Sequence, residues 1–61
     1  MPEKVREQII AVAETGETNM FDWRYVQVIA NRMHFFELVV FLDDRKNRAE
    51  YANFIMYGDG R

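Results

Sequence analysis

Two runs of apolar residues at helical spacing follow each other in the middle of the chain. Each run repeats at i, i+3, i+4 and i+7, which places its side chains along one face of an α-helix. The two runs are Val26, Ile29, Ala30 and Met33, and then Phe35, Leu38, Val39 and Leu42. Only His34 lies between them, so the spacing predicts two short helices joined by a sharp corner. Because histidine is one of the few non-glycine residues enriched at positive φ, we expect His34 to form that corner.

Capping residues predict where the helices begin and end. Pro2 and Glu3 suit a first helical turn, and Gly16 suits the left-handed position that closes a helix. Asp22 is the expected N-cap of the second helix, with Asn19 as the alternative. The predicted helices are residues 3–15, 22–33, 35–45 and 47–57.

The boundary between the last two predicted helices is open. Residues 43–48 are all polar, and Asn47 has capping-box spacing to Glu50. Either a fourth helix begins at Asn47, or one helix continues through the charged turn. Gly58 is expected to end the last helix, and residues 59–61 are expected to fray.

The link between the first two predicted helices, residues 15–22, reads TGETNMFD. Phe21 precedes the expected cap and is predicted to fold back onto Val26 as a hydrophobic staple. Met20 is predicted to lie in the groove between the two helices. The apolar pair indicates that the link is itself packed.

The chain is short and carries no covalent staple. Its 61 residues include no cysteine, which excludes disulfides and cysteine-based zinc sites. A domain of this size buries only about 60% of its unfolded surface. The hydrophobic fraction of 49% suits dense helix packing or oligomerisation. Together with the helical spacing, it predicts an all-α fold: a small bundle of three to four helices in a single domain over residues 1–61. The bundle is expected to have a helix-turn-helix-like corner at residues 26–42.

Composition also limits the setting in which the chain acts. The formal net charge is −2, which is not typical of a nucleic-acid-binding protein. The longest apolar run, Leu38 to Leu42, is far shorter than the roughly 20 residues that cross a bilayer. No signal peptide is recognisable at the N-terminus. We therefore expect a soluble, cytoplasmic protein without membrane contact.

Several large apolar side chains fall outside the helical stripes. A helix that is apolar nearly all round, as the third one is, is usually buried. One interpretation is that this helix lies at the centre, wrapped by the others. The other is that one side stays uncovered and binds a second copy or another protein. The candidate interface residues are Trp23, Tyr25, Phe36, Val40 and Phe41.

Nucleic-acid binding is the alternative function. A DNA reader presents Arg, Lys, Asn or Gln from the first turns of its second helix. Residues 35–42 contain no cation and no amide. Arg45, Lys46 and Arg48 form the one basic cluster, but acidic residues are interleaved with them, which favours a solvated charged turn. Nucleic-acid binding is therefore not the expected function.

The sequence offers no catalytic pattern. His34 is the sole histidine, and the chain has neither serine nor cysteine to act as an activated nucleophile. No residues have the spacing of a metal site or a phosphate-binding loop. We expect no enzyme activity, no metal and no cofactor.

The chain resembles a family of short proteins of unknown function encoded in phages and prophages of Gram-positive and gut bacteria. The resemblance is carried by TGETNMFD at 15–22, Val26-Gln27, residues 29–31, residues 37–39, Glu50-Tyr51 and residues 54–56. In those relatives the corner residue is glycine where this chain has His34, and the charged turn is shorter. The resemblance implies a phage-encoded protein acting in the host cytoplasm, and it assigns no catalytic residue.

Together these observations predict a helical protein–protein interaction module that associates with itself as a homo-oligomer. Its expected partner is a host or phage protein, such as a host defence component, which it would regulate or inhibit. A helix-turn-helix-like transcriptional regulator is the alternative.

Overall fold

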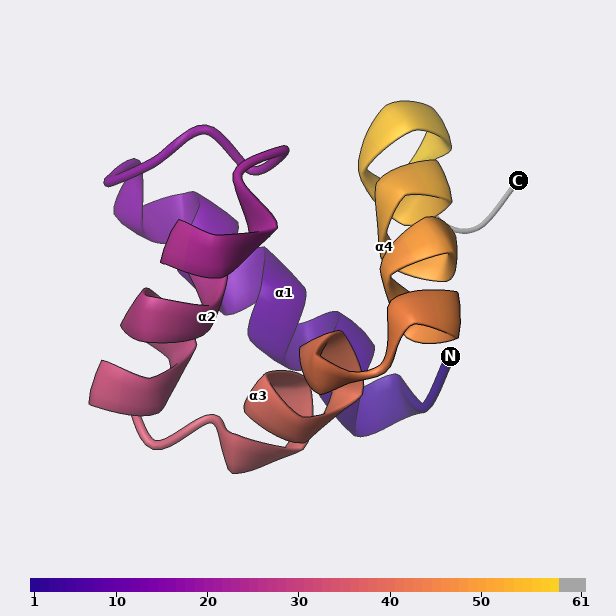
Figure 1. Cartoon of the computed structure of the whole chain (residues 1–61). Helices are drawn as coiled ribbons and strands as arrows, with labels where there is room; N and C mark the ends of the chain where they lie inside the picture. Colours follow the sequence, from indigo (N-terminus) through magenta and orange to yellow (C-terminus); the bar gives the residue numbers. More distant parts are fainter. Residues whose placement is uncertain (59–61) are drawn as a thin grey trace.

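The computed structural model describes residues 1–58, and within them the chain forms four α-helices and no strand (Figure 1). The helices are α1 (Glu3–Thr15), α2 (Trp23–Arg32), α3 (Phe36–Asp43) and α4 (Arg45–Tyr57). The predicted all-α bundle is confirmed, in its four-helix form. The expected fraying of residues 59–61 lies outside the described residues.

The first two helices begin and end where their capping residues predict. Gly16 has φ 66°, in the left-handed region, and its N–H donates to the carbonyl of Ala13. Asp22 caps α2 by accepting a hydrogen bond from the backbone N–H of Tyr25 at 3.3 Å. Asn19 instead accepts from the N–H of Phe21, so it stabilises the turn before the helix.

The corner between α2 and α3 is a Schellman motif. His34 has φ 63°, as predicted, and is the one non-glycine residue with positive φ among those described. The N–H of His34 donates to the carbonyl of Asn31, and the N–H of Phe35 donates to the carbonyl of Ala30. These two bonds satisfy the last carbonyls of α2 while the chain reverses.

The junction between α3 and α4 differs from the expectation. Asp44 has an extended backbone (ψ 123°), so α3 and α4 are not one continuous helix. Its carboxylate accepts from the N–H of Lys46 at 2.9 Å and caps α4. The prediction that Asn47 starts this helix is wrong, because Asn47 lies inside the first turn of α4.

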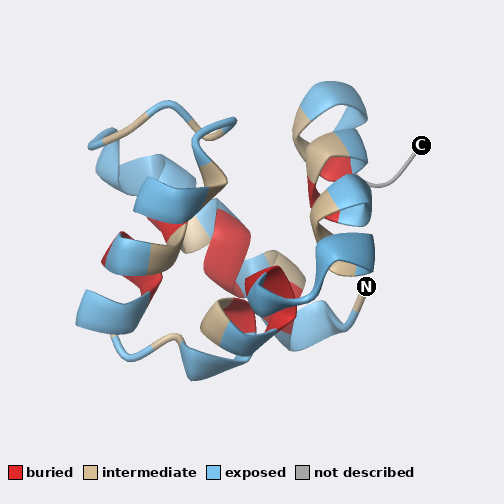
Figure 2. Cartoon of the chain, viewed as in Figure 1, coloured by how far each residue is buried: buried red, intermediate tan, exposed pale blue. Residues whose placement is uncertain are grey.

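The core lies where α3 meets the other three helices, since α3 packs against each of them. Figure 2 shows the buried positions on the inner sides of the helices. The Cα radius of gyration is 10.1 Å, close to the roughly 10.5 Å expected of a compact globule of this length. The core residues are Val5, Ile9, Val12, Val26, Ile29, Ala30, Leu38, Phe41, Leu42, Tyr51 and Phe54. The third helix thus packs against all three others, as one interpretation expected, but it is not wrapped on every side, because Phe36 and Val40 remain exposed.

The link between α1 and α2 is packed through one of its two apolar residues. Met20 packs against the core, as predicted, and its carbonyl accepts a hydrogen bond from the hydroxyl of Tyr51. Phe21 is more than half exposed, so most of its ring faces solvent. Phe21, which was predicted to fold back onto Val26 as a staple, is therefore not enclosed at this position.

Candidate functional site

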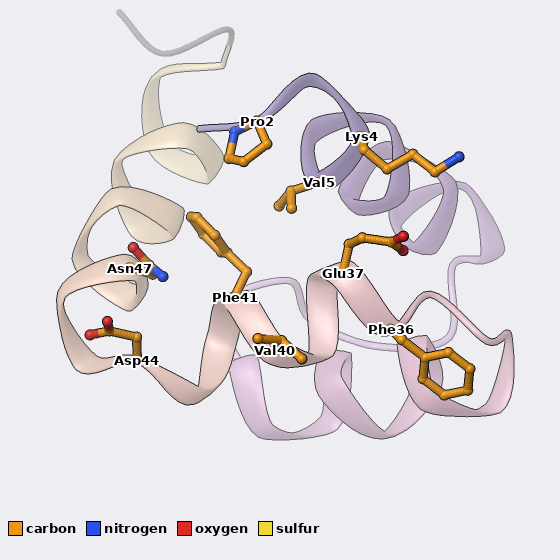
Figure 3. A pocket seen from close by; sticks show the side chains of 9 residues that line it. All are labelled: Pro2, Lys4, Val5, Phe36, Glu37, Val40, Phe41, Asp44 and Asn47. Atoms are coloured by element: carbon orange, nitrogen blue, oxygen red, sulfur yellow. The ribbon is translucent and has the colours of Figure 1, made fainter.

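An open groove runs along the outer side of α3, between the start of α1 and the start of α4 (Figure 3). Its volume is about 620 Å³. The residues that line this α3 groove are Pro2, Lys4, Val5, Phe36, Glu37, Val40, Phe41, Asp44 and Asn47. Its floor and sides are mainly apolar, and its charged groups lie toward the two ends.

The apolar composition of α3 explains why the groove exists. Leu38 and Leu42 are fully buried. Phe36 and Val40, four residues apart and therefore on one face of the helix, are 53% and 67% exposed. An α3 with this sequence cannot bury all its sides in so small a bundle. Large apolar side chains consequently remain in solvent beside a hollow.

The prediction that Phe41 is an exposed interface residue is wrong. We expected it to point away from the core together with Phe36 and Val40, but it is only 8% exposed and belongs to the core. In Figure 3 its ring points between Pro2 and Asn47. Phe41 thus forms the floor of the groove, while Phe36 and Val40 lie along its open side.

Gln8 holds the N-terminal end of α3 in place. The residue before α3, Phe35, has no side chain that caps the helix. Gln8, buried on α1, accepts a hydrogen bond from the N–H of Leu38 at 2.9 Å. Its amide nitrogen donates to Glu37 Oε1 at 2.8 Å. Gln8 therefore supplies the missing cap from a different helix.

Gln27 holds the C-terminal end of α3 from the opposite side. Its Nε2 lies 2.8 Å from the carbonyl oxygen of Val39 and 2.8 Å from Asp43 Oδ1. These bonds join α2 to the C-terminal half of α3. The groove is therefore built on a helix fixed at both ends by side chains from its neighbours.

Sequence analysis missed both glutamines. Gln8 had a detectable signal, because it lies three residues after Val5 and four before Val12, on the buried stripe of α1. A polar residue on such a stripe is expected to have a buried hydrogen-bond partner. Gln27 gave no comparable signal, since it is adjacent to the α2 stripe and only partly buried.

The charges of the groove lie at its ends. At one end, the hydrogen bond from Gln8 lowers the pKa of Glu37, with smaller contributions from the Glu37 backbone N–H and from the charge of Lys4. Asp44 lies at the other end of α3 (Figure 3). The ends are therefore different: one carries Lys4 with Glu37, the other a carboxylate.

The two aromatic candidates on α2 do not line the groove. Trp23 is partly buried against the core, and the guanidinium carbon of Arg48 lies 4.2 Å from its ring centroid. Arg24 approaches the same ring at 5.4 Å. Tyr25 is largely exposed on α2. The structure thus brings Phe36, Val40 and Phe41 together and leaves Trp23 and Tyr25 elsewhere.

The basic cluster and the histidine have local roles in the described part of the chain. Arg48 stacks on Trp23, while Arg45 and Lys46 are exposed. The ring of exposed His34 lies 5.6 Å from that of Phe36. Among residues 1–58, no three acidic, histidine or cysteine side chains gather as a metal site would require. None of the helices described is long and apolar enough to cross a membrane.

Comparison with known protein families gives a match over nearly the whole chain. The model of a protein family described as a domain of unknown function, DUF5049, matches residues 1–59. No curated protein and no solved structure is significantly similar to the chain.

Proposed function

We propose, for a chain that belongs to the DUF5049 family, a non-enzymatic function: it is a helical module that binds protein through the α3 groove and associates with itself. The observation that carries this proposal is the exposure of Phe36 and Val40 beside a hollow with an apolar floor. Scattered apolar side chains are normal on a surface. Contiguous ones that border a groove are typical of binding sites.

The energetics of the groove support binding. Phe36 is 53% exposed, so about half of the 150–250 Å² that a phenylalanine can bury is still in contact with water. At roughly 25 cal/mol per Å², burying this remainder is worth about 2–3 kcal/mol before the cost of association is subtracted. Because Gln8 and Gln27 already fix α3, little further ordering of the helix is needed when a partner binds.

The setting we propose rests on the resemblance to phage-encoded proteins. In that setting the partner is a host or phage protein in the host cytoplasm, and the chain acts as its regulator or inhibitor. A host defence component is one such partner. The resemblance supports the setting, and the groove supports the mode of binding.

Capture from the lysate of phage-infected bacteria tests this function. The immobilised intact chain is expected to retain a specific protein, and Phe36→Glu is expected to lose it. Val28→Glu is the matched control, because Val28 is also exposed on a helix but lies outside the α3 groove. Two outcomes would contradict the proposal. In one, Phe36→Glu captures the protein as well as Val28→Glu does; in the other, neither the native chain nor Val28→Glu captures a specific protein.

The helix-turn-helix alternative gains little support from the α3 surface. The exposed residues of α3 are Phe36, Glu37, Val40 and Asp43, none of which pairs with phosphate. A salt-titrated DNA gel shift addresses this alternative directly, since phosphate-driven binding weakens steeply as salt rises. We expect no shift at low salt.

A further inference from the structure

We infer that the α3 groove receives a second copy of this chain, in a two-fold dimer whose α3 helices run antiparallel. In this dimer the Phe36 side chain of each copy enters the groove of the other. The inference deepens the proposed function and rests on it, because it names the occupant of the same surface.

The first argument is that the surface is complementary to itself. A two-fold interface requires one patch to carry both a projection and the hollow that receives it. Phe36 projects at the N-terminal end of α3, and the hollow formed by Pro2, Phe41 and Asn47 lies toward the C-terminal end (Figure 3). An antiparallel arrangement brings each projection over the opposite hollow. Both copies then bury their exposed phenylalanine.

The position of Val40 is the second argument. It is the most exposed large apolar residue in the described chain and lies near the midpoint of α3. When two equal helices cross antiparallel about a two-fold axis, the residues at their midpoints face each other. Val40 of each copy therefore packs on the partner's Val40 at the centre of the interface, where apolar contacts are most effective.

Charge selects the antiparallel orientation over the parallel one. Lys4 lies at the Phe36 end of α3 and Asp44 at the opposite end (Figure 3). The antiparallel dimer brings the Lys4 and Glu37 end, whose two charges sum to zero, close to the partner's Asp44, where Lys4 supplies the opposite charge. A parallel dimer would bring Asp44 close to the partner's Asp44, and like charges in an interface are unfavourable.

The available surface sets the strength of the dimer. A standard interface takes about 800 Å² from each partner, which is about a fifth of the 4138 Å² accessible surface of this chain. The nine residues that line the groove are fewer than the roughly 20–30 residues that each side of a standard interface contributes. We therefore expect reversible dimerisation with a dissociation constant in the micromolar range, not a permanent dimer.

Cross-linking gives a direct geometric test, because the chain has no cysteine of its own. Under mild oxidation, Val40→Cys is expected to form a disulfide-linked dimer, since a disulfide needs Cα atoms within about 7 Å. Val28→Cys is the control, because Val28 is also exposed (57%, against 67% for Val40) but lies on α2, and it is expected to remain largely monomeric. Equal cross-linking of both variants, or none at Val40→Cys, would overturn the inference.

Sedimentation equilibrium over a range of concentrations tests the charge arrangement. Asp44→Asn keeps a good capping residue for α4 but removes the charge, and is expected to weaken the dimer about two- to tenfold at low salt. Lys4→Glu is expected to weaken it further, and adding Asp44→Asn to Lys4→Glu should recover part of the loss. A dimer that becomes tighter on Asp44→Asn would indicate the parallel arrangement and contradict ours.

The two proposals fail in different ways. If the native chain is monomeric at every concentration but Phe36→Glu still abolishes capture of another protein, this inference and the proposed self-association are wrong, while the proposed binding of another protein through the α3 groove stands. If neither a dimer nor a Phe36-dependent partner is found, both are wrong. Circular dichroism of each variant confirms that the helices remain folded.

Discussion

At the scale of single residues, the placement of α3 depends most on Gln8. This side chain is 5% exposed, and it uses its oxygen and its nitrogen in separate hydrogen bonds to consecutive residues of α3. Its oxygen is a second acceptor for the N–H of Leu38, which also donates to the carbonyl of Phe35 at 3.1 Å. Gln8 therefore aligns α1 with the helix that carries the groove.

We predict that Gln8→Ala destabilises the fold. It removes one of the two acceptors of the Leu38 N–H, which keeps its 3.1 Å bond to the carbonyl of Phe35, and it removes the bond to Glu37. The lost hydrogen bonds are expected to cost about 0.5–1.5 kcal/mol. In a domain of this size, each kcal/mol lowers the melting temperature by roughly 4–8 °C. Thermal unfolding followed by circular dichroism measures the effect. Glu7→Ala, at the exposed neighbouring position, is expected to change stability little.

The same variant changes how stability depends on pH. In the native chain the folded-state pKa of Glu37 is lowered, first of all by the Gln8 hydrogen bond. Its stabilising contribution is therefore present above the ordinary pKa of glutamate and is lost as the pH falls through the lowered value. Gln8→Ala should lose less of its remaining stability over that acid interval. An unchanged acid dependence would show that the Gln8–Glu37 bond contributes nothing to stability.

At the scale of helices, the junction between α3 and α4 is set by Asp44. Both Asp44 and Asn47 are residue types that cap helices well. The carboxylate of Asp44 makes the capping bond, and Asn47 is partly buried within the helix. The break at Asp44 separates the groove floor on α3 from the groove wall on α4.

We predict that Asp44→Ala lowers the unfolding free energy by about 0.5–2 kcal/mol, because an uncapped helix end is less stable. Asp44→Asn should lower it far less. Asn47→Ala is expected to show no capping loss. Chemical denaturation of the three variants compares them, and a larger loss for Asn47→Ala than for Asp44→Ala would place the helix start at Asn47 after all.

At the scale of the whole molecule, α4 is the least enclosed helix, since α3 is its main packing partner. Tyr51 provides a second attachment, because its buried ring lies in the core and its hydroxyl reaches the carbonyl of Met20 in the α1–α2 link. The amino group of Met1 adds a 2.7 Å ion pair to Glu50. Burial raises the pKa of Tyr51, so its hydroxyl remains a donor throughout the physiological range.

Tyr51→Phe tests this attachment. We expect it to lower stability by about 0.5–1.5 kcal/mol through the lost hydrogen bond. Amide hydrogen exchange should rise more in α4 than in α1 to α3, because local opening follows the weakest attachment. Tyr57→Phe, at an exposed position on the same helix, is the control. Uniform acceleration across all four helices would contradict a separate attachment of α4.

Local signals account for what the sequence alone determined. Helical spacing predicted the approximate bounds of the helices but left their number at three or four, and Gly16, Asp22 and His34 marked ends that the structure confirms. Each of these depends on a residue's own backbone preference or on a bond to a residue a few positions away. Such interactions depend little on the tertiary structure. A local sequence pattern is therefore enough to predict them.

The candidate site depended on the tertiary structure. Periodicity cannot choose the buried side of a helix that is apolar nearly all round, so only the packing of α1 and α4 placed Phe41 inside and left Phe36 and Val40 outside. The bonds from Gln8 and Gln27 to α3 join residues far apart in the chain. The choice of Asp44 over Asn47 likewise follows from where α3 has to end. These features depend on residues that are close in space but far apart in the sequence, and the sequence alone does not identify such neighbours.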